Sequence, residues 1–339
     1  MRREVGDRVV TPFIASPISW RVMAIPESMT LLSGTARRWH SLDPLLPDAA
    51  VVRERGGFEW VAAPGRAGSL LYRTHRLEAT DLGSIWREPC TATMVPMVGD
   101  GSPRELDDLL RWWREAAGPE LGERLSTGAA YMWLPSRDTW AVPTLHRHGF
   151  QPHTMLVVRD YIGRHPPPLP SDGLRICPAT LDHAEDVIFL WQEVIAYDSQ
   201  IGICRDGEQT AAILRQATFE LLARREQAIW MAELRGVPVG LCVVDLPAYC
   251  DGVAAYVRCD GPAYISAFGI RSDQRGKGIG RRLVAHVHAL LAAAGHRTIL
   301  LHHAVMNPLS APFWARSKYR PLWAVWRLPA PEWRGRNFT

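Results

Sequence analysis

The second half of the chain alternates short apolar runs with amphipathic stretches. Runs rich in branched and aromatic residues predict β-strands; they span Leu174–Ile176, Ala228–Leu234, Val239–Leu246, Ala263–Ile270, Thr298–His302 and Leu322–Leu328. Apolar positions repeated every three or four residues predict helices; they span Asp182–Tyr197, Glu208–Arg224 and the segment between Gly280 and Gly295. This order predicts a domain of mixed α and β structure.

The first half of the chain carries a weaker version of the same pattern. An amphipathic helix is predicted at Leu106–Ala117, and strands are predicted at Ala129–Leu134 and Met155–Arg159. Between the halves, residues 164–173 are rich in proline, which favours a stiff, extended linker. We therefore predict an N-terminal domain in residues 1–163, a linker in residues 164–173 and a C-terminal domain in residues 174–339.

The strand at Ala263–Ile270 leads into a glycine-rich loop, residues 275–280, which reads Arg-Gly-Lys-Gly-Ile-Gly and runs into a helix. Glycines let a backbone approach a ligand closely, and the first turn of a helix offers unpaired N–H groups at the positive end of its dipole. Basic side chains crowd the same point: Arg271, Arg275, Lys277, Arg281 and Arg282. The loop therefore predicts a ligand that carries phosphates.

Glycine spacing separates the known phosphate-binding loops. A nucleotide P-loop ends in Gly-Lys-Ser/Thr, and a dinucleotide fingerprint needs Gly-x-Gly-x-x-Gly; the chain has neither here. Instead, Arg275, Gly278 and Gly280 form Arg-x-x-Gly-x-Gly, which resembles the pyrophosphate loop of the GCN5-related N-acetyltransferase (GNAT) superfamily. After the next strand, the superfamily has an asparagine, a small residue, an aromatic pair and a Gly-Phe or Gly-Tyr ending. Asn307, Ser310, Phe313-Trp314 and Lys318-Tyr319 occupy these places.

This resemblance covers most of Leu174–Leu328 and implies both a fold and a co-substrate. The implied fold class is α/β (α+β), with two tandem GNAT-like domains, each a mixed, splayed β-sheet flanked by helices. Residues 98–103 lack the Arg-x-x-Gly-x-Gly pattern and its charge, so the first domain resembles a degenerate copy without a coenzyme loop. An unrelated α/β domain is the alternative for this half. The tandem arrangement is similar to that of the mycothiol synthases, whose substrate nothing in this chain specifies.

The implied co-substrate is acetyl-CoA or another acyl-CoA, without a metal. By resemblance, it contacts Phe268, Gly269, Ile270, Arg271, Arg275, Gly276, Lys277, Gly278, Ile279, Gly280, Arg281, Asn307, Ser310, Phe313 and Trp314. A backbone N–H from Phe268–Ile270 is expected to polarise the thioester carbonyl. Two departures stand out: Trp314 replaces a tyrosine that protonates the departing thiolate in relatives, and Lys318 replaces a glycine. Ser310 is the nearest replacement hydroxyl, unless the thiolate leaves unaided.

Acyl transfer to an amine also needs an acceptor for the proton of the amine. The strand at Ala263–Ile270 carries no carboxylate, although relatives often have a glutamate there. The candidate bases are His302, His303, Glu193, Asp198 and Asp245. We rank the two histidines first because histidine titrates near neutral pH, and strand alternation directs only one of them into the cleft. Two further histidines, His286 and His288, are expected on the surface.

Composition narrows the remaining classes of function. The chain has 39 basic and 35 acidic residues, a formal charge of +4 that is too small to predict nucleic-acid binding. Its six cysteines form no paired spacing, which favours free thiols in a reducing compartment over a zinc site. No apolar stretch has transmembrane length, so we expect a cytoplasmic protein with no membrane partner.

We therefore expect an acyl-CoA-dependent N-acyltransferase that acts on a primary amine of a small molecule or peptide. Two alternatives stay open. The basic cluster could serve an acyl carrier protein and its phosphopantetheine, with a peptide or natural-product amine as acceptor. The missing tyrosine and strand carboxylate could instead mark a non-catalytic acyl-CoA-binding module.

Overall fold

The computed structural model describes residues 25–63, 68–99, 101–124, 128–160 and 173–329. The predicted linker therefore lies outside the described residues, apart from Gly173. The helices are α1 Ile25–Leu42, α2 Ala49–Arg55, α3 Pro103–Arg124, α4 Val142–Arg147, α5 Ala184–Gln200, α6 Thr210–Leu222, α7 Asp251–Ala254, α8 Ile279–Ala293 and α9 Ser310–Arg316. In this part of the chain, no helix is long and apolar enough to cross a membrane.

The strands of the described residues join into one sheet of eleven, in the order β1-β2-β3-β4-β11-β5-β10-β9-β8-β7-β6. They are β1 Glu59–Ala62, β2 Ser69–Arg76, β3 Cys90–Met97, β4 Ala129–Pro135, β5 Gln151–Asp160, β6 Leu174–Pro178, β7 Ile229–Leu234, β8 Val237–Asp245, β9 Ala263–Ile270, β10 Thr298–Ala304 and β11 Arg320–Pro329. The mixed α/β class and the predicted strands of the second half are confirmed.

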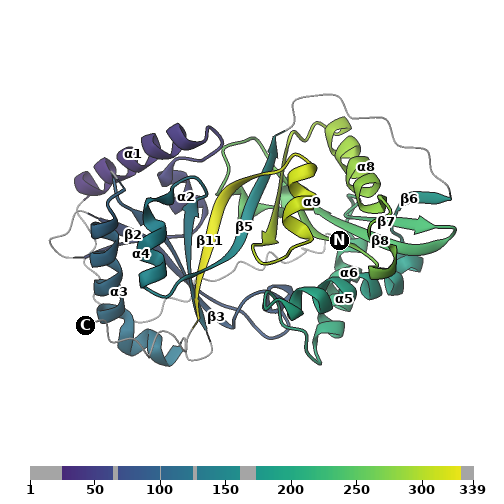
Figure 1. The fold of residues 1–339 in the computed structure, drawn as a ribbon, viewed down its shortest axis with the longest axis horizontal. Helices are drawn as coiled ribbons and strands as arrows, with labels where there is room; N and C mark the ends of the chain where they lie inside the picture. The colour runs from purple at the N-terminus through teal and green to yellow at the C-terminus, as the bar shows by residue number, and fades with distance from the viewer. Residues whose placement is uncertain (1–24, 64–67, 100, 125–127, 161–172, 330–339) are drawn as a thin grey trace, which may run out of the picture.

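The two halves exchange their last strands. β11, from the second half, pairs with β4 of the first half, and β5 pairs with β10 of the second half. β11 and β5 then pair with each other, antiparallel, and they run side by side through the centre of the molecule (Figure 1). The prediction of a separate sheet in each half is therefore wrong. The backbone groups at the edge of each half form their hydrogen bonds with the other half.

The sheet opens between β9 and β10, as the resemblance predicted. These parallel strands pair only from Ala263 to Ile265 on β9, and the rest of β9 pairs with β8 alone. The register of β8 and β9 shifts at Ser266, which marks a β-bulge, and bulges commonly re-aim strands next to sites. Helix α5 packs closely here: a Cβ on Gly269 would lie 2.2 Å from Val194 Cγ2, so only glycine fits.

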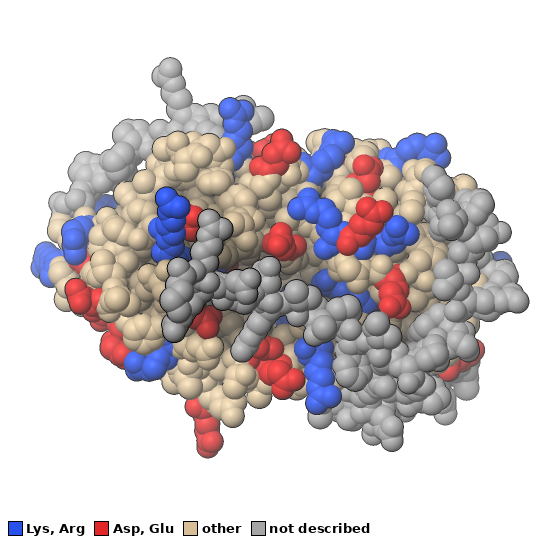
Figure 2. All heavy atoms as spheres, turned by 180° about the vertical axis from the view of Figure 1, so that it is seen from behind, with Lys and Arg blue, Asp and Glu red and all other residues tan. Residues whose placement is uncertain are grey.

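Helices cover both faces of the sheet. In the second half, α5 and α6 pack on one face through Trp191 and Leu214, and α8 packs on the other through Leu283 and Val287. His288 of α8 is buried and its Nε2 lies 2.8 Å from Tyr319 Oη, so its predicted surface position is wrong. On the outer surface, basic and acidic side chains are interspersed over the face shown in Figure 2, in keeping with the small net charge.

Candidate active site

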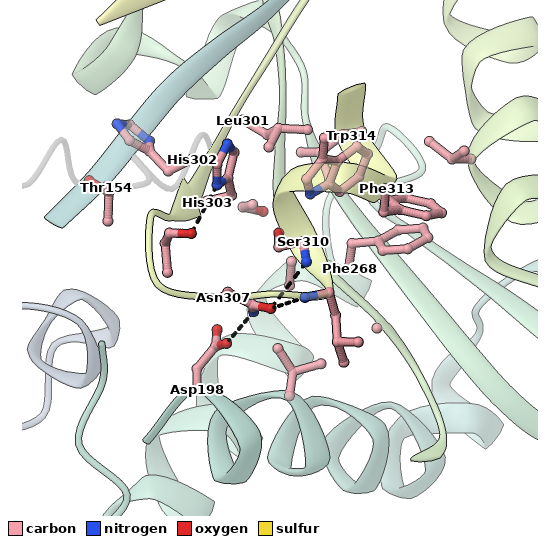
Figure 3. Close-up of a pocket in the computed structure, with 18 of the residues that line it drawn as sticks. Thr154, Asp198, Phe268, Leu301, His302, His303, Asn307, Ser310, Phe313 and Trp314 are labelled. Atoms are coloured by element: carbon pink, nitrogen blue, oxygen red, sulfur yellow. Dashed lines mark hydrogen bonds between the residues drawn. The ribbon is translucent and has the colours of Figure 1, made fainter. Parts of the chain in front are cut away.

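A cavity of about 1730 Å³ follows the opening in the sheet. At one end it is lined by the glycine-rich loop, in the middle by β9, β10 and α9, and at the other end by side chains of the first half. It therefore joins the predicted coenzyme loop to a space large enough for a second reactant. Figure 3 shows residues that line the cavity, among them His302, His303 and Trp314.

The glycine-rich loop has the backbone shape of an anion cradle. Gly276 and Gly278 both have φ of +78°, and a Cβ on either would meet no atom within 4 Å. Gly278 is the N-cap of α8, so its neighbours present the unpaired N–H groups of the first helical turn to the cavity. Gly280 is closely packed: its Cβ would lie 3.3 to 3.5 Å from Ile270, Phe313 and Phe268.

The basic side chains around this loop differ in their engagement. Arg275 donates to Ile270 O at 3.1 Å and lies over the Tyr197 ring, while Lys277 donates to Asp273 O at 3.1 Å. Arg281 and Arg282 line the cavity. Arg271 does not line it, and its guanidinium is paired with Asp273 at 2.7 Å; its contact with the phosphates stays a prediction.

Helix α9 forms a wall of the cavity next to the loop. Asn307 Oδ1 accepts the N–H groups of Leu309 and Ser310 at 3.0 and 3.1 Å, which satisfies two donors of the first turn. Its Nδ2 donates to Asp198 Oδ1 at 3.1 Å, so α9 is tied to α5 across the cavity (Figure 3). Ser310 lines the cavity at the first position of the helix.

The aromatic pair of α9 packs onto β9. Trp314 is 5% exposed and meets the edges of Phe268, Phe313 and Tyr319 with ring centroids near 5 Å. Phe268 and Phe313 stack at 5.1 Å. Trp314 therefore forms part of a wall beside the sheet opening, and its indole offers no acid for the leaving thiolate.

Three of the five candidate bases line the cavity: His302, His303 and Asp198. The other two do not. Asp245 is held by Arg224 at 2.6 Å, and Glu193 lies on α5 outside the cavity lining. Helical and strand position alone did not show which way either side chain faces, and a role for either carboxylate as the base stays a prediction.

The three remaining candidates have different protonation behaviour. Burial, together with the charge of Arg87, lowers the pKa of His302 to about 3, and its Nδ1 lies 3.0 Å from Tyr264 Oη. Burial also lowers the pKa of His303; its Nδ1 donates to Ala304 O at 3.0 Å, the tautomer that leaves a lone pair on Nε2. Burial raises the pKa of Asp198 to about 6.

The equivalent opening in the first half is filled. β3 and β4 pair from Thr91 to Met94 on β3, and Pro96 then removes one N–H from the free part of the strand. Arg38 of α1 donates to Val98 O at 2.7 Å and pairs with buried Asp138 at 3.1 Å. A coenzyme would have to displace these contacts.

Each half also extends a loop over the opening of the other. The β8–β9 loop carries Tyr256, which stacks on Trp133 of β4 at 4.1 Å and closes the first half. The β2–β3 loop carries Trp86 and Arg87 to the cavity of the second half, anchored by Arg205 Nη2 on Arg87 O at 2.5 Å. Sequence reasoning missed these residues because no local motif marks a loop that acts in the other half.

The structure also brings together Cys177, His183 and Glu233, whose ligand atoms lie within 4.8 Å of one another. Glu233 is paired with Arg175 at 2.6 Å. The His183 Nδ1 accepts the Thr180 N–H at 3.0 Å, which places the ring proton on Nε2, toward Glu233. These contacts describe a hydrogen-bonded cluster, which the spacing of cysteines along the sequence could not reveal.

Comparison with known proteins gives a family match and structures of similar fold. Residues 195–319 match the Acetyltransferase (GNAT) family. A GCN5-related N-acetyltransferase from Sphaerobacter thermophilus is 15% identical, covering 89% of this chain and 92% of its own, with a TM-score of 0.59. Another from Kribbella flavida is 13% identical, covering 90% and 95%, with a TM-score of 0.44. No curated protein matches the sequence.

The first of these structures spans both halves of this chain, so the fold extends beyond the segment that the family matches. The sheet opening and the glycine-rich loop both lie within residues 195–319. Residues 195–319 thus match the Acetyltransferase (GNAT) family, which supports an N-acyltransferase, and the fold of the whole chain is similar to that of a GCN5-related N-acetyltransferase.

Proposed function

We propose that this enzyme transfers an acetyl group from acetyl-CoA to the primary amine of a small molecule. One observation carries the proposal: a single cavity connects a glycine-rich helix start, the part of β9 that β10 leaves unpaired, and space for a second reactant. The diphosphate of the coenzyme would lie at Gly276–Arg281, and its pantetheine would pair with the unpaired edge of β9 as an added strand does.

The reaction would run as a direct transfer. The amine nitrogen attacks the thioester carbon, a C–N bond forms, the C–S bond breaks and the coenzyme leaves as a thiolate. A backbone N–H in Phe268–Ile270 would stabilise the oxyanion. The thiolate would take a proton from Ser310 or from solvent.

His303 is the proposed acceptor for the amine proton, directly or through a water. It lines the cavity, its Nε2 carries the lone pair, and its pKa stays closer to neutral than that of His302. The neutral His302 would remain hydrogen-bonded to Tyr264 and keep the strand in place.

The test is product formation by the purified full chain with acetyl-CoA and a panel of primary amines, followed by thiol release and product mass. Turnover with any amine above the rate of thioester hydrolysis would support the proposal. Binding of acetyl-CoA without transfer to any amine in the panel would favour a non-catalytic module and contradict it.

A further inference from the structure

The end of the cavity farthest from the glycine-rich loop is built mainly by the first half. We call it the acceptor lobe; its walls include Arg73, Trp86, Arg87, Tyr131, His153 and Tyr264. Its position beyond His302 and His303 places it where the second reactant of an acyl transfer would enter. The β2–β3 loop of the first half therefore completes the site of the second half.

The acceptor lobe is cationic. Among the described residues that line the whole cavity, Asp198 is the one carboxylate, and it lies beside α9, hydrogen-bonded to Asn307. Arg73 is held by neutral groups, Gly56 O and Tyr256 Oη. By contrast Arg327, just outside the lobe, is neutralised by Glu88 at 2.5 Å.

Arg87 is the arginine available to a ligand. In the part of the chain that the structure describes, its guanidinium has no carboxylate partner, while its backbone carbonyl is fixed by Arg205. Arg87 is exposed and lines the cavity together with His153 and His302. Burial lowers the pKa of both histidines, and the charge of Arg87 lowers it further.

We infer that the acceptor is an amine that also carries an anionic group, a carboxylate or a phosphate, bound by Arg87. This inference rests on the proposed acetyl transfer. Arginine binds either anion through two parallel hydrogen bonds. A polycationic acceptor would meet no carboxylate among the described residues that line this lobe, because Glu88, which accepts from Tyr131 Oη, does not line it and is paired with Arg327.

The experiment compares matched probes that differ in the anionic group: L-phenylalanine against L-phenylalaninamide, and phosphoethanolamine against ethanolamine. The full chain is assayed with acetyl-CoA as wild type, Arg87→Gln, Arg87→Lys and Arg76→Gln. Arg76 is an exposed arginine nearby that does not line the cavity, so its variant controls for net charge. Using the ratio between variants removes the difference in intrinsic amine pKa within each pair.

Arg87→Gln should lower kcat/KM for the anionic member of the preferred pair about 10- to 100-fold, as expected for loss of a charge-assisted bond, and change its neutral partner less than twofold. Arg87→Lys should recover part of the loss, and Arg76→Gln should match wild type. The probe pair whose anionic member loses activity in Arg87→Gln shows whether the anionic group is a carboxylate or a phosphate. An equal effect on both members of each pair, or a preference for the neutral members, would overturn the inference.

Calorimetry separates this inference from the proposed function. In the presence of coenzyme A, which allows no transfer, the anionic probe should bind at least tenfold more tightly than its neutral partner, and Arg87→Gln should abolish the difference. Such binding without any acetylation would support the anionic acceptor and reject acetyl transfer. Acetylation without any anion preference would do the reverse.

Discussion

The two halves of this protein place equivalent residues in opposite roles. Met132 and Leu301 are each the last residue of their strand to pair with the parallel neighbour, and six residues later stand Asp138 and Asn307. In the first half Asp138 is paired with Arg38 of α1, whereas in the second half Asn307 is bonded to Asp198 of α5. At equivalent positions, the first half therefore holds the Arg38 guanidinium, whereas the second half forms an open wall of the cavity.

The comparison shows that the second half has an open site because it lacks the residues that fill the first half. The first half joins β3 to α3 through residues 98–102, while the second joins β9 to α8 through the longer segment 271–278. Strand alternation puts Leu134 where the second half has His303. In the first half, Arg38 donates to Val98 O and the Tyr256 ring stacks on Trp133, contacts that a coenzyme bound there would have to displace.

The largest effect is expected from placing a carboxylate in the cradle of the second half. Gly278→Asp adds a side chain at a φ of +78° and a negative charge where phosphates would bind. Donor affinity should fall on the order of 100-fold, from backbone strain and reversed electrostatics. Calorimetry with acetyl-CoA measures it.

Gly236→Asp is the matched control, because Gly236 has a φ of +79° in an exposed turn away from the cavity. It should bind the donor as wild type does, with one site per chain. Two sites in wild type, or undiminished binding in Gly278→Asp, would remove the distinction between an open and a filled half.

The next largest effect concerns His303, whose equivalent position in the first half is occupied by Leu134. His303→Ala should reduce turnover about 100-fold with donor affinity kept, because it removes the proposed proton acceptor. The lowered pKa of His303 predicts a rate that rises with pH through a midpoint below 6.5, the ordinary pKa of histidine, as the imidazole loses its proton.

His302→Ala and Asp198→Asn are assayed beside it. His302→Ala should cost less, because a neutral histidine with a pKa of about 3 is a weak base. If His303→Ala keeps its rate while Asp198→Asn loses it, the base is Asp198, and the profile should then titrate near its pKa of about 6.

The junction between the halves should make the fold sensitive to acid. Burial lowers the pKa of His153 on β5 to about 4 and that of His302 on β10 to about 3. In the unfolded chain both titrate near 6.5, so protons stabilise the unfolded state as pH falls through that value. At pH 5 each histidine should cost about 2 kcal/mol of unfolding free energy.

Urea unfolding at pH 7.5 and pH 5 measures this loss. His153→Gln should reduce it by roughly the share of one histidine, while His296→Gln, at a histidine away from the junction, should leave it unchanged. An unfolding free energy that does not decrease toward pH 5 would show that the junction tolerates charged histidines.

The sequence predicted the parts of this molecule that local chemistry determines. The loop at Arg275–Gly280 was identifiable because its glycines and its helix start are adjacent in the chain, and the predicted strands of the second half are confirmed. The exchange of β5 and β11 was not identifiable from the sequence, because both are apolar strands that suit either half of the sheet. Arg87 was missed for a related reason: its loop belongs to one half by sequence and to the other by position.

The smallest effect lies in the turn before the last strand of each half. The first half has Gly149 at a φ of +78°, and the second has Lys318 at +68°, a conformation that disfavours any side chain. Lys318→Gly should therefore stabilise the protein by about 0.5–1 kcal/mol, the relief of left-handed strain less the extra entropy of glycine in the unfolded chain. Urea unfolding at pH 7.5 measures it, and Gly149→Ala should shift stability the opposite way by a similar amount. If Lys318→Gly instead destabilises, the lysine contributes contacts at the mouth of the cavity that outweigh its backbone strain, and the two turns differ in role as well as in sequence.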